Sequence, residues 1–513
     1  MRASGILLPV FSLPSEFGIG DFSHTAKSFI ERLAAAGQQY WQILPLAPAG
    51  GFNSPYQPLS CVAGDPVYIS PSVLLRKGLL TEEDLSAWTA LSTEMPADKI
   101  CYEALLPFRK ELLRKAFSRF EETPAYRKYC RDNADWLQDY ALFTALRAHF
   151  GGISWSDWPE ELRHRKPEAL ASWREKLAEE IRLELWIQYE FRCEWQEILS
   201  CAHENGVRII GDIPIYASFD SAECWTHPEL FKLRKDLRPL AVSGCPPDDF
   251  APEGQRWGNP LYNWREHERT GFRWWIERLR RNFELYDMIR LDHMRGFESY
   301  YSIPAEDPTA MNGRWIKGPG MKFFKAVREA LGDCRFIAED LGLITPEVRK
   351  LIKRTGLPGM KVLQFAFDGD PDNPYLPENY TENCVVYTGT HDNDTTRGWY
   401  KSLSEEARQQ ITRYLRSSRS PGISETQASL RAPLFSGRSA CELLVMLAMQ
   451  SRADLCIIPI QDYLLLDSEA RVNTPGTISD NWEWRMAKDA FTPELAEYIR
   501  RLTSSSGRMQ PQI

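Results

Sequence analysis

Paired cysteines, basic stripes and long apolar runs are all missing from this 513-residue sequence, and each absence narrows its class. The 11 cysteines are an odd number and none is spaced as CxxC, which argues for free thiols in a reducing compartment and against a disulfide framework or zinc ribbon. The formal net charge is −8 and no basic stripe is present, so we expect no nucleic-acid partner. No run reaches the roughly 20 apolar residues of a membrane span, so we expect no membrane partner.

Cofactor and targeting signatures are also missing. The chain has no GxGxxG after a predicted strand, no Walker loop and no tight cluster of acids, so we expect neither a cofactor nor a metal. The apolar run Ile6–Phe11 is too short for the core of a signal peptide, which leaves a cytoplasmic enzyme as the expectation. The 17 tryptophans suit a neutral substrate such as a sugar, because flat rings stack on sugar faces, although most of them should lie in the core.

Short apolar or β-branched runs, most of them ended by polar residues, recur along the chain. They are Gly5–Val10, Gln39–Leu46, Val207–Ile213, Tyr286–Leu291, Arg335–Ala338, Gly359–Phe367, Cys384–Tyr387 and Leu455–Ile460. Runs of this kind are typical of strands buried on both faces of a parallel sheet. Eight of them, separated by helical spacers, predict an α/β fold with a closed (β/α)8 barrel.

The gap between the second and third predicted strands is unusually long and carries helical periodicity. Apolar residues in Leu177–Ile198 step by three and four, as on one face of an amphipathic helix. We therefore predict barrel segments at residues 1–70 and 201–503 and a mostly helical inserted subdomain at 71–200. The polar segment 504–513 is expected to be a flexible tail.

Four acids end the predicted third, fourth, fifth and seventh strands or lie just beyond them: Asp212, Asp292, Glu339 and Asp392. In a parallel barrel these strand ends converge on one mouth, where active sites are found. A lone Asp at such a position is as easily a helix N-cap, but four together make capping alone a poor explanation.

Clustered carboxylates serve two kinds of chemistry, metal binding and glycosyl transfer. Metal loops have closely spaced acids, which this sequence lacks. Retaining glycosyl transfer needs a nucleophilic carboxylate and a protonated acid roughly 5–5.5 Å apart. A third acid can raise the pKa of the proton donor and hold the sugar.

Four motifs surround these acids: Gly211–Tyr216, Arg290–Phe297, Ile337–Gly342 and Thr388–Thr395. In this order they resemble motifs of the amylomaltases or disproportionating enzymes, glycoside hydrolase family 77. Gly211–Tyr216 resembles the motif after their third strand, Arg290–Phe297 their nucleophile region, Ile337–Gly342 their acid/base region and Thr388–Thr395 their stabiliser region. Further similar stretches are Ser54–Gln57, Pro246–Asp248, Gly254–Pro260, Gly313–Trp315, Arg471–Gly476 and Asn481–Arg485. The resemblance spans about residues 5–485 and implies 4-α-glucanotransferase activity on this barrel, without a cofactor.

The resemblance implies three catalytic residues. Asp292 is the nucleophile, Glu339 the general acid and base, and Asp392 the group that holds the distorted sugar. Arg290, two residues before the nucleophile on the same strand face, should lower the pKa of Asp292.

The implied substrate-binding residues are Tyr56, Asp212, Trp257, Asn259, Arg290, His293 and His391. Tyr56 and Trp257 are candidate stacking platforms, with plain packing as the alternative, and both histidines can hydrogen-bond sugar hydroxyls. Asp212 is equally well interpreted as a structural residue of the site.

One departure from the family pattern concerns the segment Gly244–Gly258, which is expected to be a loop over the cleft. The family usually has Tyr after Pro-Pro-Asp, where this chain has Asp249 before Phe250, so an aromatic sugar contact is expected to be lost.

The expected partners are maltooligosaccharides and starch-type or glycogen-type α-glucans. The oligomeric state stays open, with a monomer favoured. Two alternative functions also stay open, a retaining α-glucan hydrolase and an inactive glucan-binding protein.

Overall fold

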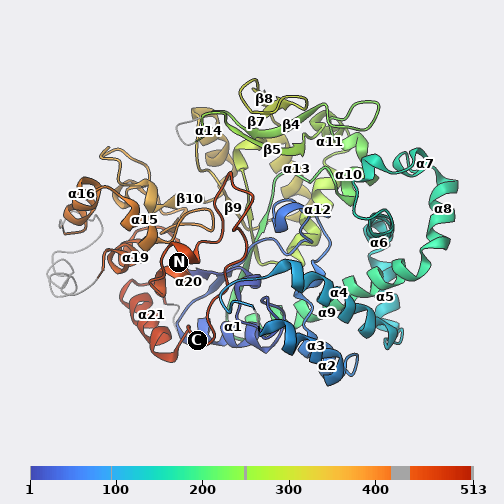
Figure 1. Cartoon of the computed structure of the whole chain (residues 1–513). Helices are drawn as coiled ribbons and strands as arrows, with labels where there is room; N and C mark the ends of the chain where they lie inside the picture. The colour runs from blue at the N-terminus through green and yellow to red at the C-terminus, as the bar shows by residue number, and fades with distance from the viewer. Residues whose placement is uncertain (1, 94, 248–250, 417–438, 510–513) are drawn as a thin grey trace.

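In the residues that the computed structural model describes, 2–93, 95–247, 251–416 and 439–509, eight parallel strands close into a central barrel (Figure 1). The strands are β1 (Ala3–Leu7), β2 (Tyr40–Gln42), β3 (Arg208–Ile213), β6 (Met288–Leu291), β9 (Phe336–Ala338), β10 (Gly359–Val362), β11 (Cys384–Tyr387) and β12 (Leu455–Pro459). Around the barrel they follow the order β1-β12-β11-β10-β9-β6-β3-β2. All eight predicted strands are confirmed, and most are shorter than the predicted runs.

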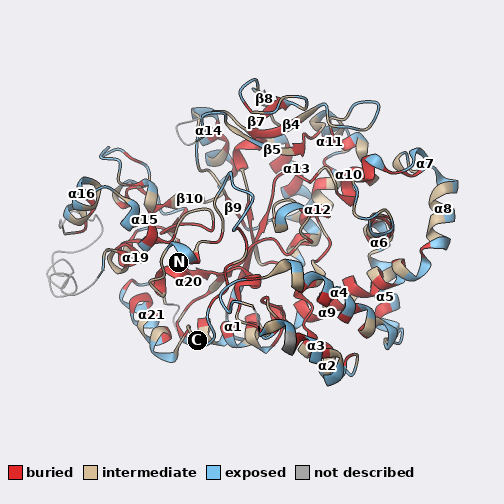
Figure 2. Ribbon diagram, in the orientation of Figure 1, coloured by how far each residue is buried: buried red, intermediate tan, exposed pale blue. Residues whose placement is uncertain are grey.

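The barrel strands are buried on both faces, as their apolar sequences require (Figure 2). Alternate residues from different strands, such as Leu7, Ile210 and Val385, pack in one cluster inside the barrel, while Ile6 and Ile209 belong to the larger cluster under the helices. On β3, Asp212 comes two residues after Ile210 and lies on the same face of the strand. The side chains that point into the barrel therefore become polar toward the mouth.

Helices cover the outside of the barrel. They include α1 (His24–Ala35), α9 (Ala178–Glu204), α12 (Arg273–Phe283), α13 (Met321–Leu331), α14 (Pro346–Thr355), α15 (Thr396–Ser402), α16 (Glu405–Arg416), α19 (Ala440–Gln450), α20 (Ile460–Tyr463) and α21 (Pro493–Ser505). Two short helices, α10 (Ala222–Thr226) and α11 (Trp264–Arg269), follow β3. In the described residues every helix is too short or too polar to cross a membrane.

The predicted helical insertion between the second and third strands is confirmed. Before α9 it contains α2 (Pro71–Arg76), α3 (Glu82–Ser92), α4 (Tyr102–Ser118), α5 (Pro124–Asp132), α6 (Ala134–His149), α7 (Glu160–Arg163) and α8 (Pro167–Lys176), at the right of Figure 1. The 27-residue helix α9 contacts α5 and α6 and also α1 and β3. One helix therefore joins the insertion to the barrel, and the predicted boundary at residue 200 falls inside it.

A second, antiparallel sheet lies above the barrel in Figure 1. Its strands are β4 (Ala241–Cys245), β5 (Gln255–Pro260), β7 (Ser299–Pro304) and β8 (Arg314–Lys317), in the order β5-β4-β7-β8. The ends of the segment Gly244–Gly258, expected to be a loop, are therefore strands. Their glycines and polar residues hide any apolar alternation. They become strands because β4 pairs with the distant strand β7 and β5 pairs with β4. Asp249 and Phe250 lie outside the described residues.

Residues 504–509 are the described part of the predicted flexible tail, and they contact the barrel through Arg508. Helix α21 continues to Ser505, and the Arg508 side chain is fully buried. Its guanidinium donates hydrogen bonds to the carbonyls of Ala3 (2.8 Å), Met449 (2.7 Å) and Ser451 (3.1 Å). A guanidinium has five N–H donors, so one side chain fixes the segment against the start of the barrel. The eleven cysteines all lie in the described ranges and are free thiols.

Candidate active site

A cleft of about 540 Å³ opens at the mouth of the barrel, beyond the carboxyl ends of its strands. Asp292, Glu339 and Asp392, which are far apart in the sequence, all line it. The predicted substrate-binding residues Tyr56, Trp257, Asn259, Arg290 and His293 line it as well. Asp212 and His391 lie behind this lining and contact it through Tyr56. The structure therefore brings every predicted site residue into one place.

Arg290 lies at the centre of the buried charges. Arg290 on β6 pairs in register with Asp212 on the neighbouring strand β3. The Arg290 Nη1 donates hydrogen bonds to Asp212 Oδ2 at 2.7 Å and to Asp292 Oδ1 at 3.0 Å. Burial alone would lower the pKa of Arg290, but the two carboxylates raise it well above its usual value. Burial raises the pKa of Asp212 to about 7, although Arg290 opposes this. A single guanidinium thus holds two acids, which needs a dry and well-fixed site.

The proposed nucleophile Asp292 keeps contact with the cleft. Its side chain is 27% exposed, compared with 3% for Arg290. Burial raises the pKa of Asp292, Arg290 lowers it and Asp392 raises it further, so the net direction is upward. Arg290 lowers the pKa of Asp292 as predicted, but desolvation of the carboxylate outweighs this effect.

Glu339 follows β9 and is held by two backbone N–H groups. His293 N donates to its Oε2 and Leu341 N donates to its Oε1, each at 2.7 Å. His293 reaches this position with a left-handed backbone, φ 49°, a conformation that is uncommon outside glycine. Burial raises the pKa of Glu339 to about 7, with Asp292 adding to the rise and Arg290 opposing it. A carboxyl group with such a pKa can give and take a proton near neutral pH.

Asp392 is oriented by residues that the sequence analysis assigned to a motif but gave no role. Asn473 Nδ2 donates to Asp392 Oδ1 at 2.6 Å, and Arg471 Nη2 donates to the Asp392 carbonyl at 2.7 Å. Arg471 Nε also donates to the Asn473 carbonyl at 2.7 Å. Their membership of the Arg471–Gly476 motif was the available signal.

Tyr56, which lines the cleft, stacks on His391, which lies behind the lining. Their ring centroids are 5.3 Å apart with planes 9° apart, so one face of the tyrosine is already covered. The Tyr56 hydroxyl donates to Asp212 Oδ2 at 2.9 Å and lies 2.9 Å from His391 Nε2. Since the hydroxyl has one proton, His391 Nε2–H is the donor in the second bond. Burial lowers the pKa of His391 to about 4, so the ring is neutral at pH 7.

Trp257 and His293 form one wall of the cleft. Their rings pack edge to face, with centroids 4.8 Å apart. Burial lowers the pKa of His293 to about 3, and within the described residues its buried Nε2 has no hydrogen-bond partner. The Asn259 amide, in contrast, contacts Gln57 and the Ala217 carbonyl, which favours a scaffold role. Gln57 was not predicted individually.

The described residues contain no group of three or more His, Cys, Asp and Glu side chains placed to hold a metal ion. The side chains at the mouth that can carry chemistry are carboxylates, imidazoles and a guanidinium group. A closed parallel barrel with polar side chains gathered at the carboxyl ends of its strands defines the class of (β/α)8-barrel proteins, whose enzymes have their active sites at this end.

Comparison with known proteins gives the particular family. The model of glycoside hydrolase family 77, described as 4-alpha-glucanotransferase, matches residues 8–490. A 4-alpha-glucanotransferase of Clostridium butyricum is 42% identical over 98% of this chain and 100% of its own length, and one of Thermus thermophilus is 43% identical over 99% of each. An amylomaltase from Streptococcus agalactiae, solved in complex with acarbose, superposes with a TM-score of 0.93 at 36% identity, covering 99% of this chain and 100% of that one. The chain belongs to the 4-alpha-glucanotransferase family and is a glycosyltransferase, which confirms the resemblance.

Proposed function

We propose that this enzyme transfers segments of 1,4-α-glucan to the 4-hydroxyl of an acceptor glucan or glucose, by a retaining double displacement through a covalent bond to Asp292. Family membership supports the activity. The observation that carries the mechanism is the 2.7 Å hydrogen bond from the His293 N–H to Glu339 Oε2. It holds the proposed proton donor beside the residue that directly follows the proposed nucleophile.

Each displacement exchanges one bond at the anomeric carbon. In the first, an Asp292 oxygen bonds to this carbon while the glycosidic C–O bond breaks, and Glu339 gives its proton to the leaving oxygen. In the second, the acceptor 4-hydroxyl oxygen bonds to the carbon, the Asp292–carbon bond breaks, and Glu339 takes the hydroxyl proton. The pKa of Glu339, raised to about 7 chiefly by burial, suits both roles.

Asp392 is the proposed partner of the distorted sugar's hydroxyls in the transition state. The hydrogen bond from Asn473 supports this role, because it fixes the carboxylate in place. A hydrogen-bond acceptor that is already in place stabilises the transition state without having to move during the reaction. The unpaired Nε2 of the neutral His293 is suited to a hydrogen bond with a sugar hydroxyl. We assign Trp257 the stacking role, since one face of Tyr56 is covered by His391.

The proposed substrates are maltooligosaccharides and starch-type or glycogen-type α-glucans, used in the cytoplasm. The reaction needs no activated nucleotide sugar, because the bond broken in the donor and the bond formed in the product are of the same kind. The protein acts as a monomer in this proposal.

Incubation with pure maltotriose tests the proposal. Transfer yields glucose together with chains longer than the substrate, whereas a hydrolase yields shorter products only and a binding protein yields none. Asp292→Asn should lower the rate by several orders of magnitude while its circular dichroism spectrum stays unchanged, because it removes a nucleophile with little change in volume. Near-normal turnover by that variant would contradict the assignment.

A further inference from the structure

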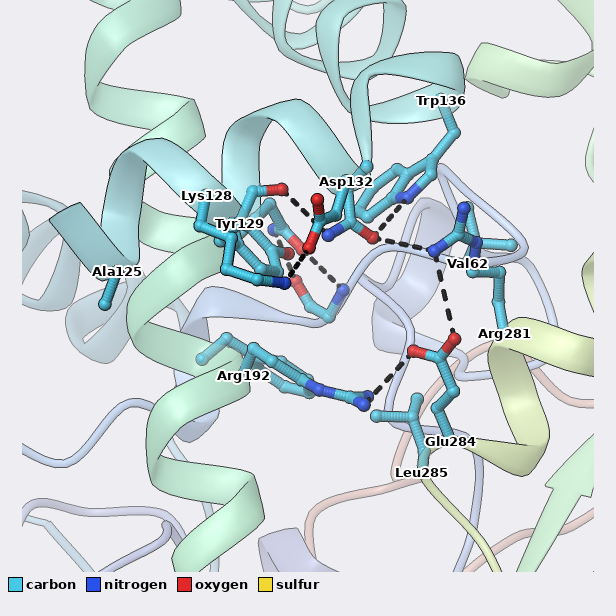
Figure 3. Close-up of a pocket in the computed structure, with 14 residues that line it drawn as sticks. Val62, Ala125, Lys128, Tyr129, Asp132, Trp136, Arg192, Arg281, Glu284 and Leu285 are labelled. Carbon is cyan, nitrogen blue, oxygen red and sulfur yellow. Dashed lines mark hydrogen bonds and ion pairs between the residues drawn. The ribbon is translucent and has the colours of Figure 1, made fainter.

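Arg295 is a buried arginine that has no carboxylate partner. The residue is 6% exposed, and none of the ion pairs among the described residues includes it. A hollow of about 390 Å³ bordered by α5 and α9 shows the more usual arrangement, in which Arg192 is paired with Glu284 at 3.1 Å and Lys128 with Asp132 (Figure 3). Burying a cation without a carboxylate costs stability, and what offsets the cost is the set of contacts that the guanidinium makes.

The side chain of Arg295 connects three parts of the barrel mouth. It comes three residues after Asp292, in the loop that follows β6. Its Nη1 donates a hydrogen bond to the carbonyl of Leu343, in the loop that follows β9 and Glu339. The guanidinium carbon also lies 3.6 Å from the centroid of a Trp315 ring, on strand β8 of the second sheet. A planar guanidinium can stack on a ring and donate in its own plane at the same time, which an ammonium group cannot do.

The carboxylate of Glu339 is held by the same two loops. His293 N, from the loop after β6, donates to Oε2, and Leu341 N, from the loop after β9, donates to Oε1. One carboxylate can keep both bonds only while the two loops stay at their present separation. The hydrogen bond from Arg295 to Leu343 spans that separation and therefore fixes it.

The segment 342–344 of the loop after β9 has little else to hold it. Leu343 is 58% exposed, and Gly342 has a φ of 80°, in the left-handed region. Within the described residues, the bond from Arg295 is the only hydrogen bond to the backbone of this segment. Exposed segments with few contacts open at a low cost in free energy, so loss of this bond should free the loop.

Arg295 lies outside the lining of the cleft, so it acts through its neighbours and not on the substrate. Its positive charge adds to the effect of burial in lowering the pKa of His293 to about 3, which keeps that imidazole neutral. Through Trp315 it also contacts the second sheet, in which β5 carries Trp257 of the cleft wall. The side chain thus connects the two catalytic loops with one wall of the cleft.

We propose that Arg295 is a positioning residue for Glu339. It holds the loop after β9 against the loop after β6 and so keeps the acid aligned with Asp292. The inference rests on the proposed function, because it takes Glu339 as the acid. Misplacing a catalytic group by about 1 Å can lower a rate about 100-fold. The loss should fall on the step that needs the proton of Glu339 and should leave binding of the glucan nearly unchanged.

Two substrates with different leaving groups test the proposal. Maltotriose needs a proton on its leaving oxygen, whereas the fluoride of α-maltosyl fluoride leaves without one. In Arg295→Met, kcat for transfer from maltotriose should fall about tenfold to 100-fold with little change in KM, while fluoride release in the first turnover should fall less than about threefold. Arg295→Lys retains a charge and a donor, so it should recover part of the loss.

Arg508→Met is the matched control, because Arg508 is also buried and bonded to carbonyls but lies against the start of β1. It should lower stability without changing the ratio of the two rates, measured at a temperature at which circular dichroism shows each variant to be folded. If Arg295→Met does not fold, Trp315→Leu, at an exposed position, removes the stacking and should change the ratio in the same direction.

Equal losses with both substrates in Arg295→Met, or no loss with either, would overturn the proposal, as would a change confined to KM. An unchanged ratio in Trp315→Leu would overturn it where that variant replaces the first. A wild-type enzyme that converts maltotriose into shorter chains only would contradict the proposed transfer alone. The ratio would then still test the role of Arg295, since hydrolysis of maltotriose needs the same proton.

Discussion

Replacing Arg290 by methionine tests the idea that one guanidinium holds the charge balance of the barrel mouth. Its Nη1 donates to both Asp212 and Asp292, and the Asp212 side chain is 0% exposed. Methionine keeps much of the side-chain volume but leaves Asp212 buried with no cation beside it. Removing one partner of a buried pair costs about 3–5 kcal/mol, so we expect the free energy of unfolding to fall by that amount at alkaline pH.

The loss should depend on pH in a defined direction. The pKa of Asp212 is already raised to about 7 by burial, and loss of Arg290 raises it further. A carboxyl group with a raised folded pKa weakens the fold as pH rises, because the folded protein must keep a proton or bury a charge. Well below pH 7 Asp212 is mostly protonated in both folded proteins, so the deficit should be small there and should grow as pH rises through 7.

Urea unfolding followed by tryptophan fluorescence, at about pH 5.5 and about pH 9, measures the two free energies. Arg265→Met, at an exposed position, is the matched control and should change neither value by more than about 0.5 kcal/mol. Adding Asp212→Asn to Arg290→Met should restore part of the loss at alkaline pH. A deficit that is the same at both pH values, or one that Asp212→Asn fails to reduce, would refute the reasoning.

Two further predictions concern the other carboxylates. Because burial raises the pKa of Glu339 to about 7, the rate of transfer from maltotriose should decline as pH rises above about 7. Glu339→Gln should lower kcat about 100-fold to 10,000-fold and remove this decline. A variant with an unchanged pH profile would argue against Glu339 as the acid. Asn473→Ala removes the 2.6 Å bond to Asp392, a contact to a charged group worth about 1.5–3 kcal/mol, so kcat should fall about 10-fold to 100-fold with little change in KM. A change confined to KM in steady-state assays would show that Asn473 only aids binding.

The barrel was predictable because its strands are apolar runs that need burial on both faces. Runs such as Cys384–Tyr387 carry that requirement in their own residues. The strand β5, Gln255–Pro260, does not, because its Gln, Arg, Gly and Asn residues form a strand only through pairing with β4. The C-terminal segment was unpredictable for the same reason. Arg508 is a polar residue, and it is buried because its guanidinium donates hydrogen bonds to carbonyls from distant parts of the chain.

The candidate site was predictable as a set of residues but less so as an electrostatic arrangement. Strand-end positions and motifs place Asp292 and Glu339 at one mouth, since parallel strand ends converge. The net pKa direction of Asp292 was not predictable, because it depends on how far burial outweighs the attraction of Arg290. The bond from Asn473 to Asp392 joins residues 81 positions apart, which no local pattern encodes.

The central claim is that Asp292 forms a covalent bond to the sugar while Glu339 handles the proton. Mass spectrometry of the Glu339→Gln variant after rapid mixing with an α-maltosyl fluoride tests it directly, because fluoride leaves without a proton donor. We predict that the protein gains the mass of the maltosyl group and that the peptide containing Asp292 carries it. Fluoride release with no mass gain at any time, or with the label on another residue, would contradict the account.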